Sequence, residues 1–523
     1  MEDTTPHTSP RPLPMALAAV FLAYFASFFV MGKMSNALPR IAAELDGMLF
    51  YSWAIAIPFL VSAFSTLIFS KLSDLFGRRI MMLASVSLML LGAVLSATAL
   101  TFSWLIVSLS ILGLGMGAIQ PLCFSVLGDL FAPVERSRWA GLLNISSGVS
   151  ALVAPTLGGW VVDNLHWSLI FWIDVPVILL SAIFIVLGLP ARNNRQSHRI
   201  DLPGSLLLAV ASTSMIIGLS WAGSTHPWIS FPVLGLLGLS LASWLVFLRI
   251  ESKAEEPMLD PRLLTNRTFL VASVSALLST FGFTAMLSYY PLFLQGVQGT
   301  SASLSGKIIT PFSVIMSFMG IPAGFLLART RRYKWMLVTG YSILTLVMGG
   351  MVALKAEASP YWGVLITTLA GVGLGAIPTI NALIVQYAVP RKSIGVAMGG
   401  LYFFVAMGKA IGPAILGSVL NAIYARRLAI NLDPELVSQL NPATVDLIRD
   451  PRLLLSASAR LILQQEFNAL GNQGLVLLNN VLDSVRLSLE SGLRGTFLVG
   501  AISMLIALLL ILTIPVINLE DQQ

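Results

Sequence analysis

The sequence predicts an all-α membrane protein that crosses the bilayer many times, and three observations carry that prediction. Of the 523 residues, 56% are hydrophobic and 11% are charged, whereas soluble domains use about 45–50% apolar and about 25% charged residues. The mean hydropathy is +0.85. Apolar runs of about 20 residues, long enough to cross about 30 Å of hydrocarbon, recur between short charged segments. The alternating ten-residue strands of a membrane barrel do not occur in the sequence, so the spans are predicted to be helices.

Fourteen runs are predicted to span the bilayer. They cover residues 14–36, 50–70, 80–100, 104–130, 138–162, 168–190, 204–223, 229–249, 268–293, 303–328, 335–354, 362–388, 394–423 and 494–517. The stretch MEDTTPHTSPRPLP before the first run carries acids and prolines in place of a basic n-region. The first run is therefore interpreted as an uncleaved span rather than a signal peptide.

The basic residues orient these spans. They gather in alternate loops: Lys71, Arg78 and Arg79; Arg136 and Arg138; Arg192, Arg195 and Arg199; Arg249, Lys253, Arg262 and Arg267; Arg329, Arg331, Arg332 and Lys334; Arg391 and Lys392. The intervening short loops hold only Arg40 and Lys355. The positive-inside rule then predicts two cytoplasmic termini in a plasma or inner membrane. The same placement accounts for the net charge of +7, so no nucleic-acid partner is expected.

One segment, residues 425–493, interrupts the pattern on the predicted outer side. It mixes charges with amphipathic pieces such as ARLILQQEFNALG and LVLLNNVLDSVRLSLESG. These pieces predict interfacial or capping helices rather than a structureless loop.

An internal repeat divides the chain. GLGMGAIQP at 113–121 recurs as GVGLGAIPT at 371–379, and Pro155 in ALVAPTLGG matches Pro413 in GKAIGPAILG, both at a spacing of 258 residues. A parallel repeat of two six-span halves is the internal symmetry of major facilitator transporters. The predicted organisation is a tail (1–13), a first half (14–190), an inserted helix pair with linkers (191–265), a second half (266–517) that includes 425–493, and a tail (518–523).

Several motifs in order resemble the fourteen-span drug:proton antiporter family of the major facilitator superfamily. SKLSDLFGRRIMM resembles motif A, with Asp74, Gly77, Arg78 and Arg79. SGVSALVAPTLGGW resembles the antiporter motif C, with Gly148, Pro155, Gly158 and Gly159. FWIDVPV resembles the NVP element of the sixth span, with Asp174 in place of asparagine. The resemblance implies the major facilitator fold with 14 transmembrane helices, alternating access, and a cytoplasmic gate at motif A.

Each motif also has a physical interpretation. A carboxylate at one helix end and guanidinium groups at the start of the next can form a charge relay between helix termini. Small residues and a proline in motif C permit close helix contact and a bend, although ordinary helix packing gives the same pattern. The chain departs from the family at motif B, where Ile111 and Leu114 replace arginine and glutamine, and at Val30, where an aspartate is usual.

Three lysines, Lys33, Lys307 and Lys409, fall within the predicted spans. The sequence places Asp163 and Asp174 beside the outer loop near 164–167 and Asp129 at a cytoplasmic helix end, so no acid is predicted at the centre of the membrane. Lys33 and Lys307 lie toward the outer ends of their spans, where a lysine either snorkels to the interface or lines the cavity. Lys409 lies near the middle of its span. An intramembrane ionisable residue is a functional candidate by default, and structural pairing with a carbonyl or polar side chain is the alternative.

Polar and aromatic residues on neighbouring spans complete the candidate substrate-binding or coupling site, with helix–helix hydrogen bonding as the alternative role for each. They are Gln120, Asn144, Tyr289, Tyr290, Asn381, Gln386 and Tyr402.

The resulting hypothesis is a secondary transporter that exports drugs or amphiphilic small molecules, coupled to protons. A cationic cavity favours anionic or neutral substrates. A facilitator or importer of an organic anion or a lipid-like metabolite is the first alternative, and a non-transporting membrane sensor that binds a partner through 425–493 is the second. No catalytic, nucleotide-binding or metal-binding motif is found in the sequence, so neither enzymatic activity nor a cofactor is expected. We expect a monomer in the lipid bilayer, and the sequence leaves an accessory subunit open.

Overall fold

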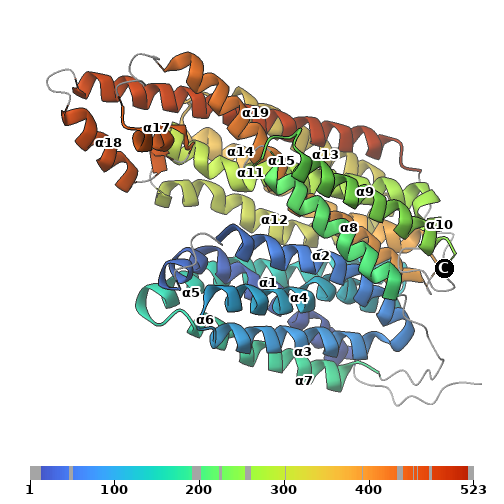
Figure 1. Ribbon diagram of the computed structural model, residues 1–523. Helices are drawn as coiled ribbons and strands as arrows, with labels where there is room; N and C mark the ends of the chain where they lie inside the picture. Colours follow the sequence, from blue (N-terminus) through green and yellow to red (C-terminus); the bar gives the residue numbers. More distant parts are fainter. Residues whose placement is uncertain are drawn as a thin grey trace, which may run out of the picture.

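The computed structural model is a bundle of long helices (Figure 1). It describes residues 13–45, 51–190, 202–222, 226–253, 261–300, 302–390, 393–432, 440–451, 453–455, 457–469 and 474–515. Residues 1–12, the predicted tail 518–523 and the basic residues Arg192, Arg195, Arg199, Arg391 and Lys392 lie outside this part of the chain.

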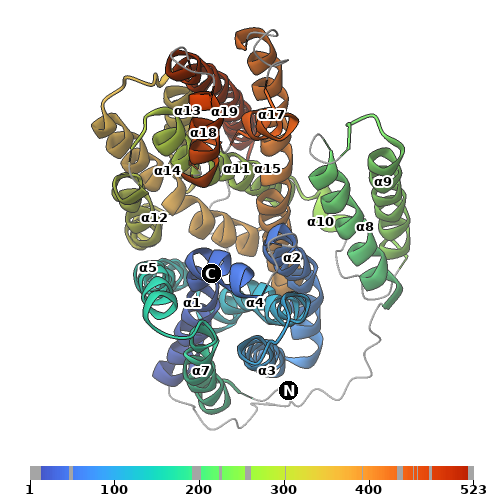
Figure 2. The same cartoon turned by 60° about the vertical axis from the view of Figure 1, so that its left-hand side comes forward.

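The first group of helices comes from the N-terminal part of the chain. It comprises α1 (Leu13–Glu44), α2 (Tyr51–Phe76), α3 (Arg78–Ala97), α4 (Phe102–Leu130), α5 (Pro133–Asn164), α6 (Leu169–Trp172) and α7 (Asp174–Gly188). Short α6 runs into α7 through Ile173, and together they make one apolar span, Leu169–Gly188. Figure 2 shows this group gathered on one side of the molecule.

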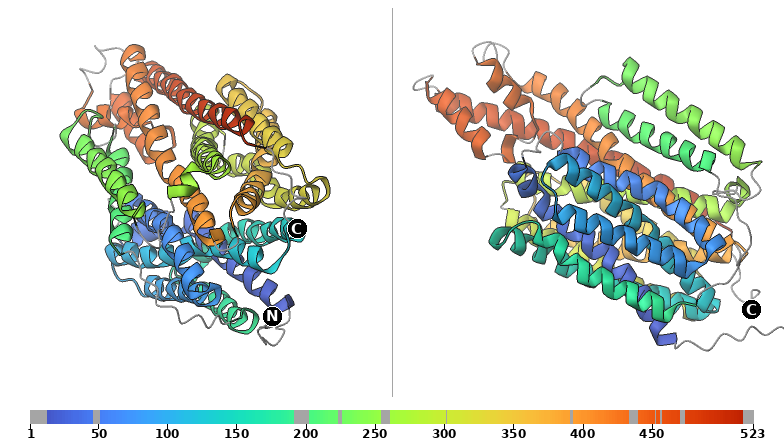
Figure 3. Two further views of the ribbon diagram at one scale, coloured as in Figure 1. Left: turned by 90° about the vertical axis from the view of Figure 1, so that its right-hand side faces the viewer. Right: turned by 60° about the horizontal axis from the view of Figure 1, so that its bottom comes forward.

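The second group faces the first. It comprises α11 (Arg267–Leu292) with the π-turn η2 (Phe293–Val297), α12 (Ala302–Thr330), α13 (Lys334–Ala353), α14 (Pro360–Tyr387), α15 (Ile394–Asn431) and α19 (Gly474–Leu512). Between the groups in sequence come α8 (Leu202–Trp221), α9 (Phe231–Glu251) and the short α10 (Pro261–Thr265). Figures 2 and 3 show α8 and α9 as a pair on the outside of the bundle, and the indole N–H of Trp228 donates to Ser418 Oγ of α15 at 2.6 Å.

The prediction of an all-helical membrane protein is confirmed. Thirteen helices of the described chain are long and apolar enough to cross a membrane, and α8 adds a shorter apolar stretch, Leu206–Leu219. These helices correspond to the fourteen predicted spans.

The bundle has two ends, which we call the inner and the outer end. The inner end holds the start of α1 and the end of α19. At this end a Cβ built on Gly188 would lie 2.4 Å from the Met15 carbonyl oxygen, and Lys334 Nζ donates to the Ile514 carbonyl at 2.9 Å. The outer end carries the helices between α15 and α19, at the left of Figure 1.

The described part of the outer segment is helical. α15 continues to Asn431 and α19 begins at Gly474, so the piece LVLLNNVLDSVRLSLESG belongs to a membrane helix that extends outward. The other piece, ARLILQQEFNALG, begins in a separate short helix. Between α15 and α19 stand α17 (Pro442–Arg449), the 3₁₀ turn η4 (Leu453–Leu455) and α18 (Ala457–Ala469). The Tyr424 hydroxyl of α15 donates to the Ile448 carbonyl of α17 at 2.6 Å. This small helical cap is therefore packed on the bundle.

Candidate functional site

The motif A residues meet at the inner end, where α2 turns into α3. Gly77 has φ of 94°, a left-handed conformation that glycine adopts without a Cβ penalty, and it lets the chain reverse directly. Arg78 then begins α3 and lies 2.5 Å from Asp74 through one guanidinium nitrogen and 2.8 Å from Asp129 of α4 through Nε. Arg79 lies in the first turn of α3. The predicted charge relay at helix termini is present in this geometry.

Asp74 also links the two halves. Its second carboxylate oxygen accepts the backbone N–H of Val396, in the first turn of α15, at 2.9 Å. A helix N-terminus offers unpaired N–H groups and a partial positive charge, so a carboxylate is stabilised there. A Cβ built on Gly395 would fall 2.2 Å from the Asp74 carboxylate. Only glycine at position 395 leaves room for this contact.

The motif C glycines are contact points between helices. A Cβ on Gly148 would lie 3.0 Å from Ser317 Cβ in α12 of the second half, and one on Gly158 would lie 2.8 Å from the Lys33 carbonyl oxygen of α1. Gly159 is half-buried in α5, and the Pro155 side chain lies outside the described part of the structure. Small residues at such positions allow backbones to approach closely.

α5 crosses between the halves beside these glycines. Asn144 Nδ2 donates to Thr379 Oγ1 of α14 at 2.9 Å, and a Cβ on Gly320 of α12 would lie 2.3 Å from that amide nitrogen. Further along, a Cβ on Gly324 would lie 2.4 Å from the Ser137 carbonyl oxygen. The contacts between the halves thus run from the inner end to the middle of the bundle.

Lys33 is buried inside the first half. This corrects the expectation that its side chain snorkels to the membrane surface or lines the cavity. Its ammonium group donates to the carboxylate of Asp174 and, at 2.9 Å, to the carbonyl of Ile170. It also lies 4.2 Å from the centroid of the Phe29 ring. Lys33 and Asp174 are each 1% exposed. The pair joins α1 to the start of α7 inside the first half, so Asp174 is a buried, paired acid within its span.

Lys307 and Lys409 have different surroundings. Lys307 is exposed, near the outer end of α12. Lys409 is half-buried in α15 and, within the described chain, has neither a hydrogen-bond partner nor an ion-pair partner. No structural pairing of Lys409 is therefore found among the described residues.

The helical period places Lys409 on the same face of α15 as Tyr402. Tyr402 lies seven residues earlier, two turns or about 10 Å along α15 and on the same face. Its ring lies 5.8 Å from Phe124 of α4, which in turn lies 6.1 Å from Tyr24 of α1. These three rings form a central aromatic cluster where the halves meet. Gly408 and Gly412 of α15 pack against α11. Lys409 therefore shares a face of α15 with Tyr402, about 10 Å outward of this cluster.

The remaining candidates divide between the interface and the interior. Gln386 is buried, and its Nε2 donates to the Phe124 carbonyl across the halves at 3.2 Å. The Tyr289 hydroxyl donates to the Pro413 carbonyl at 3.0 Å. Gln120 is half-buried and makes no side-chain hydrogen bond with a described residue. Gln386 thus joins the halves, whereas this Tyr289 bond joins α11 to α15 within the second half.

Two further candidates, Tyr290 and Asn381, lie within the second half. Tyr290 is buried, with its ring 6.2 Å from Phe293 and 6.5 Å from Phe497 of α19. Asn381 is 1% exposed and lies beside Tyr341 within the second half. Both positions suit a packing role in the second half.

Three participants were missed by sequence reasoning. The sequence places Asp174 beside the outer loop at the start of the sixth span but does not predict its pairing with Lys33, although an aspartate and a lysine near the outer ends of two spans are a signal for a pair. The backbone N–H of Val396 gives no signal in side-chain patterns. Thr379 is one of many threonines in the spans, and nothing in the sequence distinguishes it.

Comparison with known proteins places the chain among transporters. A model of the Major Facilitator Superfamily matches residues 20–413. The multidrug transporter protein MdtP of Bacillus subtilis is 28% identical over 97% of this chain and 95% of its own length. Multidrug resistance protein 3 of the same organism is 27% identical over 76% of this chain and 77% of its own length. An uncharacterized MFS-type transporter of Mycobacterium tuberculosis, Rv1877, is 32% identical over 75% of this chain and 57% of that protein.

Solved structures agree on the fold. The proton:xylose symporter XylE superposes with a TM-score of 0.61 at 11% identity, covering 97% of this chain and 98% of that one. The human organic anion transporter MFSD10 gives a TM-score of 0.58 at 16% identity, covering 96% and 99%. At these identities the likeness concerns the fold alone. The chain belongs to the Major Facilitator Superfamily and is a membrane transporter rather than an enzyme.

Proposed function

We propose that this transporter exports amphiphilic small molecules by alternating access in exchange for protons, and that its substrates are anionic or neutral. The observation that carries the substrate class is that Lys409 shares a face of α15 with Tyr402 and has no counter-charge in the described chain. In this proposal its ammonium group lies in the space between the halves. A cation in a low-dielectric site attracts anionic groups and repels cationic ones. The relatives named as multidrug transporters support export of drugs.

The inner-end contacts support an outward-facing state in this proposal. Asp74 to Val396, Gln386 to Phe124 and Asn144 to Thr379 all join the halves between the inner end and the middle. A substrate would then reach Lys409 from the outer end, and separation of these contacts would open the route from the inner end.

The substrate class is tested by dye transport in proteoliposomes. An anionic and a cationic amphiphilic dye are compared for the wild type, Lys409→Ala, Lys409→Arg and the control Lys307→Ala. We expect Lys409→Ala to lose anion transport by about tenfold or more, the equivalent of one lost charge interaction, while Lys409→Arg retains part of it. Unchanged anion transport by Lys409→Ala would refute the anionic preference.

Proton coupling is tested separately in the same vesicles. An imposed pH gradient should drive uphill dye movement, and an ionophore that collapses the gradient should stop it. Flux that ignores the gradient would refute antiport and favour a facilitator.

A further inference from the structure

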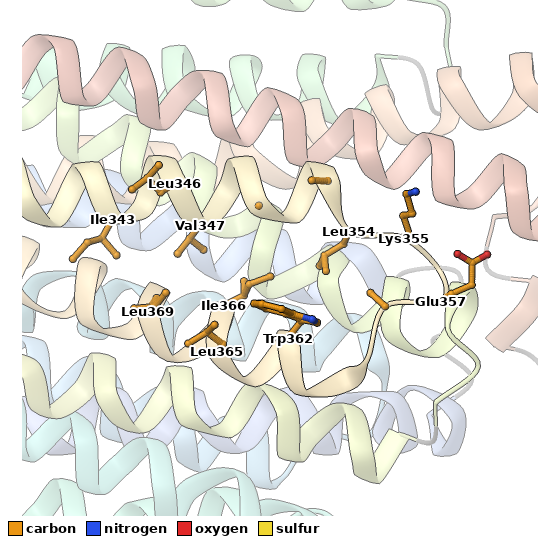
Figure 4. Close-up of a pocket in the computed structure, with 13 residues that line it drawn as sticks. Ile343, Leu346, Val347, Leu354, Lys355, Glu357, Trp362, Leu365, Ile366 and Leu369 are labelled. Atoms are coloured by element: carbon orange, nitrogen blue, oxygen red, sulfur yellow. The ribbon is translucent and has the colours of Figure 1, made fainter.

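A groove on the outside of the second half has no role in the proposed transport route. It lies between α13 and α14, has a volume of about 760 Å³, and is lined largely by aliphatic side chains and Trp362 (Figure 4). Leu346 is 75% exposed, Trp362 59% and Leu365 47%. In a bundle surrounded by lipid, such side chains face hydrocarbon, so the groove opens sideways into the membrane.

Glycines create the groove. Toward the inner end, Gly340 and Gly373 bring the two backbones together, since a Cβ on either would lie within 3.0 Å of the other's carbonyl oxygen. Toward the outer end, a Cβ on Gly350 would meet nothing within 4 Å, and Ala353 is also small. The helices touch at one end and leave an apolar slot at the other.

The outer mouth of the slot carries two opposite charges. Lys355 and Glu357 line the groove, both are exposed, and neither side chain is paired with a described residue. Figure 4 shows them at the same end, beyond Leu354, where α13 passes into the loop before α14. From Lys355 to Ile343 at the far end, twelve residues of mostly helical chain span about 18 Å, which suits the length of a lipid acyl chain.

We infer that this groove holds one phospholipid of the outer-side leaflet, with an acyl chain between α13 and α14, the phosphate at Lys355 and a primary amine at Glu357. The apolar slot supplies the burial, and the two charges complement a zwitterionic head group. Phosphatidylethanolamine has the required phosphate, which accepts from Lys355, and an ammonium group that can donate to Glu357. Phosphatidylcholine has the same phosphate but a quaternary amine that cannot donate to Glu357.

Native mass spectrometry of the full-length protein, titrated with either phospholipid in detergent, tests the proposed lipid site. The wild type should retain one lipid, with phosphatidylethanolamine held several-fold more tightly than phosphatidylcholine. Gly350→Leu fills the slot and should weaken retention of both lipids about tenfold, because contacts with several methylenes are lost. The matched control is Gly349→Leu, since a Cβ on this neighbouring glycine also meets nothing within 4 Å but Gly349 does not line the groove. It should behave as the wild type.

The head-group assignment is tested with separate variants at Lys355 and Glu357, so that test does not depend on Gly350→Leu folding well. Glu357→Gln should abolish the preference for phosphatidylethanolamine while total retention of phosphatidylcholine stays unchanged, and Lys355→Ala should weaken both lipids. Non-saturable lipid binding, or equal lipid retention by Gly350→Leu and Gly349→Leu, would refute the proposed lipid site in the groove. An undiminished ethanolamine preference in Glu357→Gln would overturn the head-group assignment.

Discussion

The carboxylate of Asp174 accepts a hydrogen bond from the ammonium group of Lys33, 141 residues earlier in the chain, and both side chains are almost completely buried. Two charges taken out of water are costly unless they are paired and further hydrogen-bonded. Lys33 gains a second acceptor in the Ile170 carbonyl and lies against the Phe29 ring. The pair therefore fixes α1 against the start of α7 inside the first half.

Breaking this pair from one side should destabilise the protein strongly. Lys33→Met or Asp174→Leu alone leaves an uncompensated buried charge, and we expect a loss of about 3–5 kcal/mol. The measurement is thermal unfolding of the purified protein in detergent. The double variant Lys33→Met/Asp174→Leu removes both charges and should recover most of that loss. If the double variant were as unstable as the sum of the singles, the two residues would not act as a pair.

The inner gate gives a second prediction. Asp74→Asn weakens the ion pair with Arg78 and the charged hydrogen bond to the Val396 N–H, each worth about 1.5–3 kcal/mol. The inner contacts should then open more often. Ser70 is buried against α15, since a Cβ built on Gly399 would lie 2.5 Å from the Ser70 Cβ. A Ser70→Cys variant therefore reports the opening of the inner contacts by the rate at which a thiol reagent labels it. We expect labelling to rise about tenfold.

Two features of the chain sharpen that experiment. The sole cysteine, Cys123, is buried, and its replacement by serine removes any background. Asp129→Asn is the matched control, because Asp129 contacts Arg78 from the same half and is 42% exposed. It should raise labelling much less. Equal effects of the two substitutions would show that the contact across the halves does not hold the inner end closed.

The sequence predicted the fold and the place of motif A, but it did not predict several contacts, for physical reasons. Apolar runs of membrane length identify spans regardless of which neighbours they contact, and the inner end of α2 followed from the charge pattern around Asp74 and Arg78. The position of Lys33 along its span did not show which way the side chain faces, since a lysine side chain reaches the membrane surface or a buried acid equally well. The outer extensions of α15 and α19 were missed because their charged, amphipathic stretches fall below the hydropathy of a span.

The contact between Asn144 and Thr379 gives a third prediction. Asn144→Ala and Thr379→Val each remove one side of a hydrogen bond between α5 and α14, and each should cost about 1 kcal/mol of stability. Since they remove the same interaction, the double variant should cost less than the sum. A double-mutant cycle of unfolding free energies measures this difference. Strict additivity would mean that the bond contributes nothing to joining the halves.

The helical cap gives the last prediction. The Tyr424 hydroxyl of α15 donates to the Ile448 carbonyl near the end of α17, and Glu466 of α18 accepts the Asn441 backbone N–H at 2.8 Å and also bonds to Thr444. Tyr424→Phe removes only the hydroxyl, so the ring packing stays and about 1 kcal/mol is lost. Because the lost bond tethers α17 to the bundle, hydrogen exchange should accelerate about fivefold in α17 while α15 and α19 keep their protection. Tyr290→Phe is the matched control, since its ring packs in the second half without contact to α17. Faster exchange throughout α15 in Tyr424→Phe would instead show that the tyrosine supports the membrane helix itself.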